Sequence, residues 1–110
     1  MKNDITYLRH ILDAIGKIES YLTGATYESF SNNSMMVDAV VRELEIVGEA
    51  SSNLSETFRD KHPDIPWRDA VDMRNFLIHE YFGVRKKVVW DTCKEDLPVM
   101  KRLIDKLLDS

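Results

Sequence analysis

The spacing of apolar residues near the N-terminus is the strongest constraint on the fold, because it follows steps of three and four. The residues at these steps are Ile5, Leu8, Ile11, Leu12, Ile15, Ile18 and Leu22. Such steps line one face of an α-helix, whereas a half-buried strand needs strict alternation. We therefore expect an amphipathic helix that Asp4 caps and that stops at Gly24.

A second helix is expected from about residue 34 to about residue 53. Its apolar set is broad and comprises Met36, Val37, Ala39, Val40, Val41, Leu44, Ile46, Val47 and Gly48. This breadth indicates a helix that is central or buried on two sides. A glycine inside a helix costs about 1 kcal/mol relative to alanine. A close approach by another helix would explain why Gly48 stands there.

The rest of the chain divides into connectors and further helices. The expected segments are a polar connector at 26–33 anchored by Phe30, a short helical turn at 54–62, a third helix from Pro66 to Gly83, and a fourth from near Arg85 that restarts or kinks at Asp96 and Pro98. Proline is tolerated at the first helical position and glycine commonly follows a helix end. These segments predict an all-α fold, a bundle of four to five antiparallel helices.

The whole chain, residues 1–110, is expected to form one domain. It contains 4 Gly and 3 Pro, which is few for a many-stranded sheet. The N-terminal residues carry charges, and no apolar run approaches the roughly 20 residues of a membrane span. We therefore expect a cytoplasmic protein with no membrane partner. Its single cysteine, Cys93, excludes an intrachain disulfide and is expected to be buried and inert.

The formal net charge of −4 means that the overall electrostatic field does not attract nucleic acid. Contact with RNA would therefore need a local basic patch. The candidates flank the third helix, and they are Arg59, Lys61, Arg68, Arg85, Lys86 and Lys87. Acidic residues interleave with them, which weakens this candidate patch.

The third helix places Arg74, Asn75, His79 and Tyr81 among large apolar residues. At about 100° per residue, Arg74 and Tyr81 share a face, whereas His79 lies about 140° around the helix from Arg74. Histidine can exchange a proton near neutral pH, and arginine binds phosphate. RNA cleavage by the 2′-hydroxyl needs a base, an acid and a cation, but no metal ion. Two copies of this helix across a dimer axis would supply that set.

These residues also have structural interpretations, which the spacing leaves open. A helical histidine can be a satisfied core residue, Arg74 can pair with Asp72 or Glu80, and Tyr81 can be a core aromatic. Outside this helix, ordinary solvated surface is the preferred interpretation for His10, His62, Glu43, Glu45 and Glu49. The glutamates could instead line a cleft or meet a cationic partner.

The segment RNFLIHEYFGV, from Arg74 to Val84, resembles the R-x-x-x-x-H-x-Y signature of the HepT-like branch of the HEPN superfamily. Four other blocks resemble that family in the same order, namely YLRHILDAIGKIESYL, AVVRELEIVGEASSNLS, PDIPWRDAVDMRN and VVWDTCKEDLPVMKRLI. The resemblance therefore covers nearly the whole chain.

This resemblance implies a HEPN-like bundle that dimerises through the motif helix. It implies a metal-independent endoribonuclease, the toxin of a type II HEPN/nucleotidyltransferase toxin–antitoxin system, with Arg74 and His79 as catalytic residues and no cofactor. Asn75 and Tyr81 would position the RNA substrate. An MntA-like nucleotidyltransferase antitoxin would add AMP to Tyr81, and the phosphate would repel RNA.

The expected partners are RNA, that antitoxin and a second copy of the chain, which could join the antitoxin in a larger hetero-oligomer. The alternative is a non-catalytic helical binding module for a nucleotidyltransferase.

Overall fold

The computed structural model describes residues 2–79 and 85–109, which form helices and connecting turns. The long helices are α1 (Lys2–Tyr21), α3 (Ser34–Asn53), α5 (Trp67–His79) and α7 (Leu97–Leu108). The short helices α2 (Tyr27–Ser31), α4 (Glu56–Lys61) and α6 (Lys86–Asp91) connect them, with a π-helical turn at Thr92–Asp96. The expected all-α class is confirmed.

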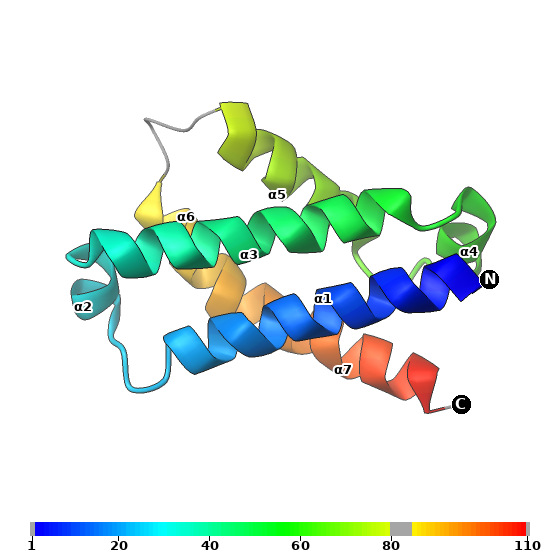
Figure 1. Cartoon of the computed structure of the whole chain (residues 1–110), viewed down its shortest axis with the longest axis horizontal. Helices are drawn as coiled ribbons and strands as arrows, with labels where there is room; N and C mark the ends of the chain where they lie inside the picture. Colours follow the sequence, from blue (N-terminus) through cyan, green and yellow to red (C-terminus); the bar gives the residue numbers. More distant parts are fainter. Residues whose placement is uncertain (1, 80–84, 110) are drawn as a thin grey trace.

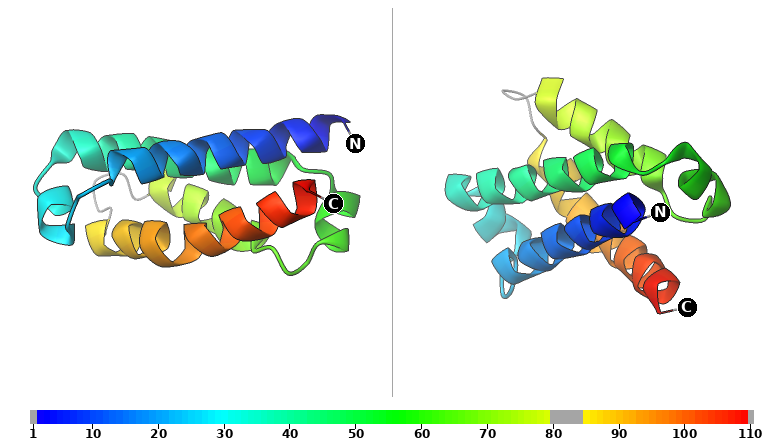
Figure 2. Two further views of the ribbon diagram at one scale, coloured as in Figure 1. Left: turned by 90° about the horizontal axis from the view of Figure 1, so that it is seen from below. Right: turned by 45° about the vertical axis from the view of Figure 1, so that its right-hand side comes forward.

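The long helices form two layers. Helices α1 and α3 lie side by side in one layer, and α5 lies with α6 and α7 in the other (Figure 2). Successive long helices run in opposite directions, so both chain ends lie at the same end of the bundle (Figure 1). The most extensive helix contacts are those of α3 with α1 and with α5. The expectation that the second long helix is central is therefore confirmed.

The buried face of α1 differs from the expected one at its first turn. Leu8, Ile11, Ile15, Ile18 and Leu22 are buried as expected, but Ile5 is 46% exposed. Asp4 takes the buried position, and the helix already begins at Lys2, so the expectation that Asp4 caps α1 is wrong.

The carboxylate of Asp4 instead joins α1 to the start of α4. It accepts hydrogen bonds from the backbone N–H of Ser55 at 2.8 Å and from the Ser55 hydroxyl at 2.9 Å. The backbone bond is the main cause of a lowered pKa for the Asp4 carboxyl, because it favours the charged form. A polar side chain is therefore buried here with its hydrogen bonds made.

The segment expected to be a polar connector at 26–33 contains helix α2, so that expectation is wrong. Thr26 caps this helix: its hydroxyl accepts from the N–H of Ser29 at 3.1 Å, and its own N–H donates to the Ser29 hydroxyl at 2.9 Å. Phe30 is buried as expected and packs on Trp90, with ring centroids 5.4 Å apart. The same polar residues serve as turns and as caps, which hides so short a helix in the sequence.

The starts of α5 and α7 agree with what the sequence predicted. Trp67 is buried at the start of α5, and its indole N–H donates to the carbonyl of His62 at 3.0 Å. The π-helical turn ends where α7 begins, and Pro98 lies in the first turn of α7, where an N–H is not needed. This break is the expected kink. The expected end of α5 at Gly83 lies outside the described residues.

Helices α3 and α5 meet closely at Gly48. A Cβ atom added to Gly48 would lie 2.7 Å from the carbonyl oxygen of Ala70 and would overlap the Cβ of Arg74. No side chain fits there unless α5 moves away from α3. The expected close helix approach is therefore confirmed, and the helix that approaches is the one that carries Arg74.

Replacing Gly48 with alanine should lower the free energy of unfolding by about 1–3 kcal/mol, because the added methyl group overpacks the contact. The matched control is Gly16→Ala in α1, where an added Cβ has no atom within 4 Å. That variant should gain up to about 1 kcal/mol from the better helix propensity of alanine. Urea unfolding measures both changes, and equal effects of the two substitutions would contradict the close approach at Gly48.

Candidate functional site

The structure describes the side chains of two of the four predicted site residues. Arg74 lies on the face of α5 that packs on α3, whereas Asn75 is exposed. His79 is the last residue of α5, but its side chain lies outside the described residues. Tyr81 also lies outside them. How His79 and Tyr81 lie relative to Arg74 therefore stays a prediction.

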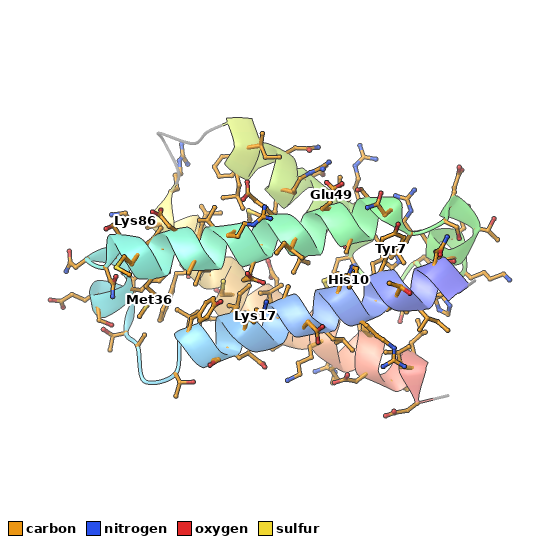
Figure 3. The ribbon with its side chains drawn as sticks, viewed as in Figure 1. Tyr7, His10, Lys17, Met36, Glu49 and Lys86 are labelled. Carbon is orange, nitrogen blue, oxygen red and sulfur yellow. The ribbon has the colours of Figure 1, made fainter. Side chains whose placement is uncertain are left out.

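Arg74 lines a hollow of about 280 Å³ between α1, α3 and α5. The residues that line it are Tyr7 and His10 from α1; Arg42, Glu45, Ile46, Glu49, Ala50 and Asn53 from α3; and Arg74 and Ile78 from α5. Figure 3 labels Tyr7 and His10 on α1 and Glu49 on α3. Charged, amide and aromatic side chains meet here, which is a lining suited to a polar ligand that also carries rings.

The guanidinium of Arg74 forms an ion pair with the carboxylate of Glu49 through Nη1. The Arg74 side chain is 22% exposed and that of Glu49 is 59% exposed. The Nε of Arg74 is buried and has no hydrogen-bond partner among the described residues. A largely covered cation is therefore held by one carboxylate at the edge of an open hollow.

The ion-pair partners considered for Arg74 from the sequence were Asp72 and Glu80. Asp72 instead pairs with Arg68, four residues earlier on the exposed face of α5, at 3.3 Å. Glu80 lies outside the described residues. The expectation of Asp72 as the partner is wrong, because a residue two positions away on a helix points to a different face.

Residues assigned to the solvated surface lie closer to the site than expected. Glu49 pairs with Arg74, which is the cationic-partner alternative rather than the preferred interpretation, and Glu45 lines the same hollow. His10 is exposed as expected, but it also lines this hollow. Its ring meets that of Tyr7 edge to face, with centroids 6.0 Å apart.

Four residues that line this hollow carried no predicted site role, namely Tyr7, Arg42, Asn53 and Ile78. The sequence of α3 did contain an indication of this polar lining, because polar residues recur in it at steps of three and four. They are Arg42, Glu45, Glu49 and Asn53. Such a stripe lies on one helix face, so it could have indicated a polar surface running beside the apolar one.

The expected basic patch does not form one surface. Arg59 and Lys61 lie on α4, whereas Lys86 and Lys87 lie on α6, towards the other end of the bundle (Figure 1). Lys87 also pairs with Asp91 at 3.0 Å, which reduces its local charge. Among the described residues, a cation next to the hollow therefore comes from Arg74 or Arg42 rather than from this patch.

Cys93 is buried as expected, and burial raises the pKa of its thiol to about 12. It therefore stays protonated at neutral pH, which makes it a poor nucleophile. Among the side chains that the structure describes within residues 2–79 and 85–109, no group of three from His, Cys, Asp or Glu could hold a metal ion. In the same ranges, no helix is long and apolar enough to cross a membrane.

A second hollow of about 300 Å³ lies between α3, α5 and the segment from the π-helical turn to α7. Its lining is mostly apolar, with Leu44, Val47, Met73, Leu97 and Met100 among the contributing residues. It contains none of the predicted site residues. Of the predicted site residues whose side chains the structure describes, Arg74 lines the first hollow and neither Arg74 nor Asn75 lines the second.

The chain belongs to the HepT-like ribonuclease family, because the family model "Ribonuclease HepT-like" matches residues 11–107. A "Probable ribonuclease HepT" of Thermococcus cleftensis is 46% identical over 101 residues, covering 92% of each chain. A "Putative RNase" of Caldanaerobacter subterraneus subsp. tengcongensis is 38% identical over 108 residues, covering 98% of this chain and 96% of the relative. The resemblance seen in the sequence is confirmed.

One relative is longer than the chain. A "Gamma-glutamylcyclotransferase and putative RNase" of Methanocaldococcus jannaschii is 41% identical over 110 residues, which is 99% of this chain and 50% of the relative. The chain therefore spans half the length of that protein. No solved structure matches the chain at a significant level. The family and the names of these relatives indicate a ribonuclease.

Proposed function

We propose that the chain is the toxin of a type II toxin–antitoxin system and an endoribonuclease that needs no metal ion. The observation that carries this proposal is the position of Arg74, a largely covered cation that is held beside an open hollow. It lies on the same helix as His79, five residues earlier. Membership in a ribonuclease family supports RNA as the substrate.

In this mechanism the 2′-hydroxyl of the RNA attacks the adjacent phosphorus, and the 5′-oxygen of the next nucleotide leaves. With two copies of α5 in a dimer, His79 of one chain takes the proton from the 2′-hydroxyl and the partner's His79 gives one to the leaving 5′-oxygen. The products are a 2′,3′-cyclic phosphate and a 5′-hydroxyl, and the protons balance over the step. Arg74 stabilises the negative charge that develops on the phosphate oxygens. Asn75, which is exposed on α5, and Tyr81 position the RNA.

The proposal includes a homodimer formed through α5. This helix makes its extensive contacts with α3, and Ile78 next to the hollow is 50% exposed. Because His79 lies about 140° around the helix from Arg74, a second α5 would bring both groups from two chains into one cleft. Light scattering that finds single chains at the concentrations used for cleavage would contradict the dimer.

Purified protein should cleave single-stranded RNA in the presence of EDTA, and His79→Ala should slow cleavage by about 100-fold or more, the usual contribution of an acid–base group. His62→Ala is the matched control, because His62 lies outside the hollow. Circular dichroism checks that both variants fold. Equal cleavage rates for wild type and His79→Ala would contradict the catalytic role of His79.

Absence of cleavage by the wild type, together with tight binding to a nucleotidyltransferase, would instead support the non-catalytic binding module. The net charge of −4 is the observation that favours this second candidate.

Regulation by the antitoxin is a separate part of the proposal. Incubation with the cognate MntA-like nucleotidyltransferase and ATP should add the mass of AMP to the chain at Tyr81, and cleavage should fall because the added charge repels RNA. Intact-mass spectrometry measures the addition. Tyr21→Phe, at an exposed tyrosine at the end of α1, is the control that should still be modified. AMP addition to Tyr81→Phe would show that the site is wrong.

A further inference from the structure

Two neighbouring residues of α3 contact the two ends of the Arg74 side chain. Gly48 gives space to its base: a Cβ added at Gly48 would overlap the Cβ of Arg74 and lie 3.0 Å from its Cγ. Glu49, the next residue, binds the guanidinium at Nη1. Two consecutive residues of α3 therefore contact the Arg74 side chain, Gly48 at its Cβ and Glu49 at its guanidinium.

The surroundings between these ends restrict the guanidinium further. Its Nε is buried without a hydrogen-bond partner among the described residues, and the side chain as a whole is 22% exposed. Nη1 already donates to the carboxylate of Glu49. An incoming anion would therefore meet Nη2 and the remaining hydrogen of Nη1, on the side that Glu49 does not occupy.

We propose that Glu49 is a positioning residue that orients Arg74 for the attack on the scissile phosphate, with Gly48 as the space that makes this orientation possible. The proposal rests on the ribonuclease function proposed above. Glu49 does not contact the reacting atoms and acts through the guanidinium. Helix α3 thereby contributes to a reaction whose catalytic groups are proposed on α5.

Glu49 could in principle have the opposite effect, if its carboxylate competed with phosphate for Arg74. The geometry favours positioning, because the carboxylate binds one nitrogen of a fork that has five donor hydrogens. The Cβ and Cγ of Arg74 also pack against Gly48, and its Nε is buried, so the part of the side chain before the guanidinium is covered. Without Glu49, the other carboxylate in the hollow, that of Glu45, would become the available partner.

The test is the steady-state cleavage of one RNA by Glu49→Gln, which keeps the size of the side chain but removes its charge. We expect kcat to fall about tenfold or more while KM changes less than about threefold, because a misoriented catalytic group lowers the rate rather than substrate binding. Glu49→Asp, which restores the charge on a shorter side chain, should recover part of kcat. A purely structural role would not give this split between kcat and KM or this rescue.

Glu19→Gln is the matched control, since the carboxylate of Glu19 also forms an ion pair, with Lys101 at 2.9 Å, but Glu19 does not line the hollow around Arg74. It should keep a kcat close to that of the wild type. In an Arg74→Ala background, Glu49→Gln should have no further effect, because the two residues act as one unit. Additive losses would overturn the coupling.

The outcomes separate the positioning role from the proposed function. If the wild type cleaves RNA, Arg74→Ala cleaves it far more slowly, and Glu49→Gln matches the wild type, then the ribonuclease function stands and the positioning role is overturned. A higher kcat/KM in Glu49→Gln would overturn it in favour of competition with phosphate. If the wild type itself does not cleave RNA, both fail. If Glu49→Gln does not fold, unchanged kinetics of Glu49→Asp and Glu49→Ala overturn the positioning role.

Discussion

At Gly48 the backbones of α3 and α5 approach so closely that an added Cβ would lie 2.7 Å from the carbonyl oxygen of Ala70. The position of the site depends on this contact. It places the root of Arg74 directly on α3 and brings the guanidinium to Glu49. The intrinsic cost of glycine in a helix is about 1 kcal/mol. The packing of α3 against α1 and α5 offsets this cost.

The site that results is local in its electrostatics. The chain carries a net charge of −4, and the lysines and arginines of α4 and α6 do not gather around the hollow. If this hollow binds RNA, as proposed, recognition depends on a few groups near Arg74 rather than on attraction over the whole surface. The aromatic rings of Tyr7 and His10 lie in the same hollow and offer faces or edges to a base. Helices α1 and α3 thus contribute to the candidate site in addition to α5.

The helical spacing predicted the long helices well, because each has one apolar face that repeats every three or four residues. It predicted Asp4 wrongly, since the partner of its carboxylate is Ser55, 51 residues along the chain. It also could not identify Glu49 as the partner of Arg74, 25 residues away, because spacing within one helix carries no information on which faces of two helices meet. The helix within 26–33 was missed because capping residues are also turn residues.

The cleavage rate of folded Gly48→Ala protein tests most directly whether the contact between α3 and α5 positions the site. If it does, kcat for RNA cleavage should fall about tenfold or more, because the displaced α5 moves Arg74 away from Gly48 and Glu49. Gly16→Ala, whose added Cβ meets no atom within 4 Å, should cleave at the wild-type rate. A Gly48→Ala protein that is folded and cleaves RNA with the kcat of the wild type would contradict this central role of Gly48.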